Sequence, residues 1–209
     1  AYHMGTPVTG GFLGVDVFFV ISGFVITGMV LGEWSETGKF SLKDFFVRRF
    51  MRLVPALGVL LIVVLVVSSL LIGPASFPEQ AALTALFAVF WASNFQIGWS
   101  SPEYFGPDSE SNLFLNLWSL SLEAQFYLLY GPLLALAFLV FKTGRRRWGL
   151  RPALLVAIGV ASLSSFALSM FEPRMAENVE AVTIGFFSPL SRVWEFGAGA
   201  LVFLLARGR

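Results

Sequence analysis

The 209-residue chain contains no cysteine and only one histidine, His3. These absences exclude a disulfide framework, a cysteine nucleophile and a zinc site built from Cys and His. Charged residues are also scarce, at 13% of the chain, where an average soluble domain has about 25%. Hydrophobic residues instead make up 56% of the chain. Because the charges fall between long uncharged runs, the composition predicts a polytopic membrane protein. We expect it to contact the lipid bilayer and not to bind nucleic acid.

Six apolar windows are long enough, at about 17–24 residues, to cross the ~30 Å hydrocarbon layer as helices. No internal repeat or polar linker separates them, so we predict an all-α transmembrane bundle of about six membrane segments. We expect 1–209 to be a single membrane-embedded domain that is truncated at both ends. The windows are Phe12–Leu31, Leu53–Ile72, Ala81–Ile97, Trp118–Phe141, Pro152–Phe171 and Pro189–Ala206.

Loop charge predicts the orientation of these segments. The loops 32–52 and 142–151 are basic and should be cytoplasmic, whereas 98–117 and 172–188 are mostly acidic and should be external. Two loops on the same side require an even number of crossings between them, yet three windows intervene. The window Ala81–Ile97 is the shortest of the three and carries Thr84, Ser93, Asn94 and Gln96, which are poor lipid-facing residues. We therefore predict that it enters and leaves on the outer side, as a re-entrant or tilted element buried in protein.

Asp16 is the one carboxylate in the first window, within the stretch GGFLGVDVFFVISGFVIT at 10–27. A carboxylate facing lipid inside a span costs roughly 2.5–3.5 kcal/mol, so Asp16 should point inward. The alternative is that the span starts later and Asp16 lies at headgroup level. We favour an intramembrane site.

Small residues flank two of the candidate sites. Glycines at 10, 11 and 14 should let the start of the first window pack closely against its neighbours. The sequence Gly-Ala-Gly-Ala at 197–200 should likewise allow close helix packing in the last window.

Three arginines precede the second window. Arg49 and Arg52 lie three residues apart, so in a helix they share one face, and Arg48 stands beside them. Guanidinium groups make bidentate contacts with phosphates, which fits a phosphorylated ligand on the cytoplasmic side. Positive-inside flanking of a span explains the same residues equally well.

Two later windows also contain charged side chains. Glu123 shares a helical stripe with Ser119 and Tyr127, and an intramembrane acid is a functional candidate, with a structural hydrogen bond to another helix as the rival interpretation. Arg192 and Glu195 are three residues apart and can pair with each other. Alternatively, Arg192 can pair with a carboxylate on another helix. We favour a structural ion pair here over a functional site.

His3 has the only side-chain type whose ordinary pKa suits general-base chemistry near neutral pH. Its place at the start of the chain, followed by Met4, also matches a cloning remnant. From the residues alone, both interpretations stay open.

Taken together, four strings in this order resemble the acyltransferase-3 family of bacterial integral-membrane O-acyltransferases. They are Tyr2-His3 with GGFLGVDVFFVISGFVIT, then DFFVRRFMRLVPAL, NLFLNLWSLSLEAQFYLLYGPLL and SPLSRVWEFGAGAL. The resemblance implies a bundle of about ten helices in the bacterial cytoplasmic membrane. It also implies transfer of an acyl group, commonly acetyl, from cytoplasmic acyl-CoA to a hydroxyl of a surface glycan or lipid-linked sugar. Acyl-CoA is then a substrate, and no bound cofactor or metal is expected.

Residue by residue, the resemblance implies that His3 is the essential histidine, that Arg49 and Arg52 form the RxxR motif, and that Glu123 is the acid of the WSLSxExQFY-like motif. We expect His3 to act as general base with Asp16 or Glu123 as its partner, and Arg48, Arg49 and Arg52 to bind acyl-CoA. Arg192 and Glu195 are expected to form a structural ion pair or part of the acceptor site.

The chain departs from the family pattern in several places. Asn116 stands where relatives often have histidine, Ala124 replaces a second glutamate, and most of the first helix is missing, so we expect this piece to be inactive alone. A membrane transporter or exporter of a glycolipid is the alternative function from another class. Acylation of a small hydrophobic acceptor such as a macrolide is the alternative within the family.

Overall fold

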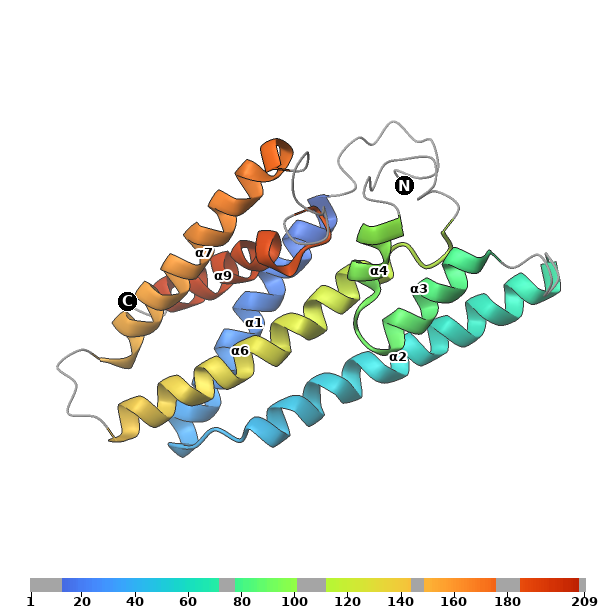
Figure 1. Ribbon diagram of the computed structural model, residues 1–209. Coiled ribbons are helices and arrows are strands. Elements are labelled where there is room, and N and C mark those ends of the chain that lie inside the picture. The colour runs from blue at the N-terminus through green and yellow to red at the C-terminus, as the bar shows by residue number, and fades with distance from the viewer. Residues whose placement is uncertain (1–12, 72–77, 101–111, 144–148, 176–184, 207–209) are drawn as a thin grey trace.

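The computed structural model describes residues 13–71, 78–100, 112–143, 149–175 and 185–206, and every regular element in these ranges is a helix. The all-α prediction is therefore confirmed. Five of the helices are long and apolar enough to cross a membrane. The helices, labelled as in Figure 1, are α1 (Leu13–Thr37), α2 (Leu42–Leu71), α3 (Glu79–Val89), α4 (Ser93–Ser100), α6 (Leu117–Thr143), α7 (Leu150–Met175) and α9 (Pro189–Ala206).

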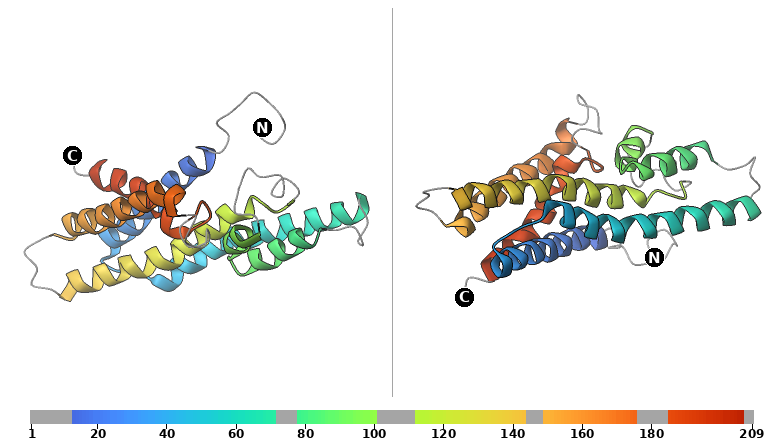
Figure 2. Two further views of the ribbon diagram at one scale, coloured as in Figure 1. Left: turned by 45° about the horizontal axis from the view of Figure 1, so that its top comes forward. Right: turned by 90° about the horizontal axis from the view of Figure 1, so that it is seen from below.

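The bundle has two groups of helices with α6 between them. On one side, α9 packs against both α1 and α7; on the other, α3 packs against α4. The central helix α6 contacts members of both groups, and α2 lies alongside it (Figures 1 and 2). Side chains from three distant parts of the chain, α1, α6 and α9, therefore meet in one core.

The turn between α1 and α2 is shorter than the hydropathy windows suggest. Gly38 adopts a left-handed backbone conformation (φ 64°), and its N–H donates to the carbonyl of Trp34 at 2.9 Å, which ends α1. Ser41 then accepts the N–H of Asp44 at 3.2 Å as an N-terminal cap of α2. As a result α2 begins at Leu42, and the arginines predicted to lie before the helix are within it.

The predicted re-entrant window is built as a helical hairpin. The helix α3 has 11 residues, so it is about 16 Å long and too short to cross the hydrocarbon layer. A turn at Phe90–Ala92, in which Trp91 has a φ of 57°, separates it from the eight-residue α4. Two short helices packed on each other agree with entry and exit on one side, which gives the even number of crossings that the loop charges require.

Backbones approach most closely where α1 crosses α9. A Cβ atom built on Gly23 would lie 1.9 Å from the backbone oxygen of Phe196, and one on Gly199 would lie 1.8 Å from a backbone oxygen of α1. Gly197 is similarly crowded by a side chain of α7, so the predicted close packing at 197–200 is confirmed. By contrast, no described atom lies within 4 Å of a Cβ built on Gly14.

Candidate functional site

Five side chains along α1 form hydrogen bonds or ion pairs with residues of other helices, and each such contact marks a level along the helix axis. From the N-terminal to the C-terminal end of α1, the contacts are Asp16 with Arg192, Ser22 with Glu123, Thr27 with Tyr130, Met29 with Arg49 and Glu33 with Arg48. At 1.5 Å per residue, the first and fourth levels lie about 20 Å apart along the helix. Under the predicted orientation, Asp16 lies towards the outer side and Arg48 and Arg49 towards the cytoplasm.

Glu123 is almost completely buried, with 1% of its surface exposed. Its Oε1 accepts hydrogen bonds from the hydroxyl of Tyr127, one turn along α6, and from Ser22 Oγ of α1 at 3.3 Å. Ser119, the third member of the predicted stripe, instead donates to the carbonyl of Asn116 at 3.0 Å. Glu123 therefore points into the bundle, and its bond from Ser22 is a hydrogen bond to another helix, as the rival interpretation of this acid predicted.

The three arginines of α2 do not share one surface. Arg49 is buried, whereas Arg48 and Arg52 are exposed. The Arg49 guanidinium carbon lies 5.8 Å from the centre of the Phe45 ring and 5.7 Å from that of Tyr127, within the range of cation–π attraction. Helical spacing placed Arg49 and Arg52 on one face, but the boundary of the core falls between them.

The polar contacts of Arg49 and Arg48 differ in kind. Arg49 Nη2 donates to the sulfur of Met29 at 3.0 Å, while its Nε is buried with no hydrogen-bond partner among the described residues. Arg48 Nη2 instead pairs with Glu33 Oε2 at 2.6 Å on the surface. Among the described residues, the buried Arg49 thus has no carboxylate partner, whereas the exposed Arg48 is paired with Glu33.

Asp16, Arg192 and Glu195 form an ion cluster between α1 and α9. Arg192 Nη1 donates to Asp16 Oδ1 at 3.0 Å and to Glu195 Oε1 at 2.7 Å, so one nitrogen serves both carboxylates. The guanidinium also lies 4.2 Å from the centre of the Phe186 ring. Glu195 is fully buried and Asp16 only partly. The structure thus contains both of the pairings considered for Arg192 and points Asp16 inward.

Aromatic rings separate this ion cluster from Glu123. Phe19 of α1 stacks on Phe196 of α9 with centroids 4.5 Å apart, and Phe196 stacks on Phe126 of α6 at 4.0 Å. The edge of Trp118 meets Phe19 at 6.2 Å. The outer ion cluster and the Glu123 level are therefore two distinct polar sites across an apolar layer.

A third polar network holds the hairpin to α6. Ser93 Oγ lies 2.7 Å from Ser121 Oγ, and Gln125 Nε2 donates to Asn94 Oδ1 at 2.8 Å and to the carbonyl of Trp91 at 2.6 Å. Ser121 and Gln125 flank Glu123 in sequence, and their pairing with the hairpin was not foreseen. The signal that could have found it is the matching set of polar side chains in 84–96, which need partners at membrane depth.

Thr84 of the hairpin links two side-chain amides, those of Gln96 in the hairpin and Asn112 before α6. Its hydroxyl donates to Gln96 Oε1 at 2.6 Å and accepts from Asn112 Nδ2 at 2.8 Å. All three side chains are buried. The polar residues of the re-entrant window are therefore hydrogen-bonded inside the protein and not exposed to lipid.

Two hollows lie near the C-terminal end of α1. The first, of about 400 Å³, adjoins Arg49 through Met29 and has a partly polar lining. Under the predicted orientation it opens near the cytoplasmic surface. Its lining residues are Gly28, Met29, Gly32, Glu33, Glu36, Thr37 and Arg48.

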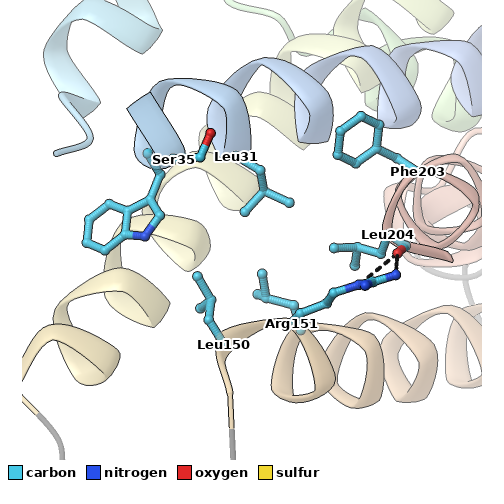
Figure 3. A pocket seen from close by; sticks show the side chains of 8 residues that line it. Leu31, Ser35, Leu150, Arg151, Phe203 and Leu204 are labelled. Atoms are coloured by element: carbon cyan, nitrogen blue, oxygen red, sulfur yellow. Dashed lines mark hydrogen bonds between the residues drawn. The ribbon is translucent and has the colours of Figure 1, made fainter. Parts of the chain in front are cut away.

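The second hollow, of about 260 Å³, is apolar apart from Ser35 and Arg151 and lies between α1, α7 and α9 (Figure 3). Figure 3 shows Arg151 reaching across to α9, where its Nε donates to the carbonyl of Leu204 at 2.9 Å. Arg151 thereby satisfies a carbonyl in the last turn of α9. Because its arginine is used in this way, we assign this hollow no part in the site.

His3 lies outside the described residues, so its predicted pairing with Asp16 or Glu123 stays a prediction. Among the residues that the structure describes, no group of three or more His, Cys, Asp or Glu side chains could hold a metal ion. What the geometry brings together is therefore a buried acid, a buried arginine and a separate ion cluster.

Residues 1–208 match the acyltransferase-3 family, described as an acyltransferase domain. The chain belongs to this family. It is 37% identical over 168 residues to the peptidoglycan O-acetyltransferase OatA of Listeria monocytogenes, a match that covers 79% of the chain and 25% of that protein. Over 153 residues it is 40% identical to a putative O-acetyltransferase of Staphylococcus aureus strain COL, covering 71% of the chain and 25% of the relative.

Staphylococcus aureus also has an O-acetyltransferase OatA that is 40% identical over 130 residues, covering 62% of the chain and 21% of the relative. The chain thus spans about a quarter of the length of the curated relatives that it matches. No solved structure matches it. For this member of the acyltransferase-3 family, the five long apolar helices agree with a multi-pass membrane protein.

Proposed function

We propose that the protein containing this chain is a membrane O-acetyltransferase. It takes an acetyl group from acyl-CoA at the cytoplasmic face and transfers it to a hydroxyl of a cell-surface glycan or glycolipid. The similarity to a peptidoglycan O-acetyltransferase favours a cell-wall glycan as acceptor. The protein would lie in the bacterial cytoplasmic membrane, with 1–209 as part of one membrane-embedded domain.

The observation that carries this proposal is the buried guanidinium of Arg49. Only 7% of Arg49 is exposed, and no ion pair to it occurs among the described residues. Within the described part of the chain, its Nε has no hydrogen-bond partner and its Nη2 has only a thioether sulfur, which is a weak acceptor. A buried cation in this state costs several kcal/mol unless an anion pairs with it. The phosphates of acyl-CoA would supply that anion.

The surroundings of Arg49 fit a donor site at the cytoplasmic end of the bundle. The 400 Å³ hollow is lined by Met29, which contacts Arg49, and by Arg48. We assign Arg49 and Arg52 to the phosphates of acyl-CoA, with Arg48 as a third contact. Because Arg48 is paired with Glu33, a phosphate would have to exchange places with that carboxylate.

We assign the acetyl-transfer step to the residues that lie further towards the outer side of the bundle than Arg49. His3 would take the proton from the acceptor hydroxyl as its oxygen attacks the acetyl carbonyl, and the CoA thiolate would leave. Asp16 or Glu123 would orient the imidazole and stabilise its cation. Ser22, which bonds Glu123, lies about 10 Å along α1 from Met29, so the thioester arm would reach inward from Arg49 towards Glu123.

Steady-state kinetics of the full-length protein in liposomes, with labelled acetyl-CoA and soluble peptidoglycan fragments, test the proposal. Loss of a charge-assisted hydrogen bond should raise the KM for acetyl-CoA about 10–100-fold in Arg49→Gln. Arg147→Gln, in the basic loop at 145–147, is the matched control and should behave as wild type. An unchanged KM in Arg49→Gln would refute the donor site.

The role of His3 has its own test in the same assay. General-base catalysis is worth about 10²–10⁴-fold, so His3→Ala should lower the transfer rate by at least 100-fold at equal expression. Near-full transfer by this variant would refute the assignment. Movement of a glycolipid across the membrane without any dependence on acyl-CoA would instead indicate a transporter.

A further inference from the structure

We propose that Tyr127 is a positioning residue that couples the donor arginine Arg49 to the buried acid Glu123. This inference rests on the function proposed above. Among the hydrogen bonds and cation–π contacts of the described residues, only those of Tyr127 reach both groups: its hydroxyl bonds Glu123, and its ring lies under Arg49.

The hydroxyl sets the position of the carboxylate. Tyr127 is 2% exposed, and its hydroxyl donates to Glu123 Oε1 from one helical turn away. The second donor to this oxygen, Ser22 Oγ, is more distant at 3.3 Å. Without the tyrosine hydroxyl, Glu123 Oε1 keeps only the longer bond from α1. The carboxylate then loses its principal fixed contact within α6.

The ring sets the position of the guanidinium. The Arg49 guanidinium lies over both the Phe45 ring and the Tyr127 ring, and these two rings meet edge to face with their centroids 6.4 Å apart. Phe45 belongs to α2, as Arg49 does, so of these two rings only that of Tyr127 links Arg49 to α6. Because no described carboxylate forms an ion pair with Arg49, we take this aromatic contact and Met29 to determine the position of its charge.

The two halves of Tyr127 can be removed separately. Tyr127→Phe keeps the ring over Arg49 and deletes only the hydroxyl that bonds Glu123. Tyr127→Leu deletes both. If the hydroxyl positions the acid and the ring positions the arginine, the first variant alters turnover alone, and the second alters turnover and donor binding together.

The chain offers a closely matched control in Tyr130. Its hydroxyl is also buried and lies 2.8 Å from Thr27 Oγ1 of α1, in the same interface as the bond from Ser22 to Glu123. Its ring stacks on Phe126 and is not among the aromatic contacts of Arg49. Tyr130→Phe therefore removes a comparable buried hydrogen bond without touching either member of the proposed couple.

The experiment measures kcat and the KM for acetyl-CoA in the full-length protein in liposomes, with thermal unfolding measured alongside. Tyr127→Phe should lower kcat about 10–100-fold, as expected for a lost hydrogen bond to a charged group, with KM within about twofold of wild type. Tyr127→Leu should in addition raise KM at least about threefold, through the lost cation–π contact. Tyr130→Phe should keep wild-type kcat and KM.

A second variant covers the case in which the Tyr127 variants fail to fold. Ser22→Ala removes the longer bond to the same Glu123 oxygen, and it should lower kcat by a smaller factor with KM unchanged. Equal kcat values for Tyr127→Phe and Tyr130→Phe, or a wild-type kcat in Ser22→Ala where Tyr127→Phe cannot be measured, would overturn the inference. If wild-type protein transfers no acetyl group from acetyl-CoA, the proposed function itself fails, which is a different outcome from active variants that do not differ.

Discussion

The crossing of α1 and α9 should not tolerate a single added methyl group at Gly23. A Cβ at this position would lie 1.9 Å from the backbone oxygen of Phe196, so the two helices would have to separate by about 1.5 Å to restore ordinary van der Waals distances. Because the obstacle is backbone, no rotamer change can relieve the clash. Gaps of this size forfeit much of the dispersion energy, which drives helix association inside a bilayer.

Overpacking of this kind costs about 1–3 kcal/mol, and we expect Gly23→Ala to lie at the upper end because the stacked rings of Phe19 and Phe196 are displaced as well. Thermal unfolding of the full-length protein in detergent measures the effect. Gly32→Ala is the control, since no described atom lies within 4 Å of a Cβ built there. It should be neutral or stabilising, because alanine is the better helix former. Equal stability of Gly23→Ala and wild type would refute the close crossing.

Three further outcomes are expected. Glu33→Gln frees Arg48 from a surface ion pair of about 0.2–1 kcal/mol, so it should lower the KM for acetyl-CoA by up to about fivefold; a raised KM would argue against Arg48 as a donor contact. Arg192→Gln leaves the fully buried Glu195 without its cation and should destabilise the protein by about 3–5 kcal/mol in thermal unfolding, and an unchanged melting temperature would contradict the ion cluster. Thr84→Val strips two buried amides of a partner and should cost about 2 kcal/mol or more in the same measurement, whereas a neutral result would show that the hairpin network is dispensable.

The positions of the helices could be predicted from the sequence because membrane spans depend on long uncharged runs. The window Pro189–Ala206 coincides with α9, and the window 81–97, predicted from the loop charges to be re-entrant, is divided into two short helices, α3 and α4. The start of α2 was placed late, since a hydropathy window detects the hydrocarbon layer and not the helix. Two local signals mark the true boundaries: the left-handed Gly38 ends α1, and the Ser41 cap begins α2.

Contacts between distant helices were harder to foresee. Helical periodicity placed Glu123 and Tyr127 on one stripe, and their hydrogen bond confirms it. Periodicity could not separate buried Arg49 from exposed Arg52, because that distinction depends on where α6 and its Tyr127 ring lie. The choice of Gly23 as the crossing point likewise depends on the path of α9, which no local pattern of α1 encodes.

The length of α2 bears on how the proposed acyl-CoA donor would bind. Thirty residues make a helix of about 45 Å, which exceeds the ~30 Å hydrocarbon layer by some ten residues. With Leu71 at one boundary of that layer, the other boundary falls close to Arg52, and the preceding turns extend into the headgroup region. A polyanionic donor bound there could keep its phosphates in a hydrated layer. Only its uncharged arm would need to enter the low-dielectric interior, which avoids the large cost of dehydrating several negative charges.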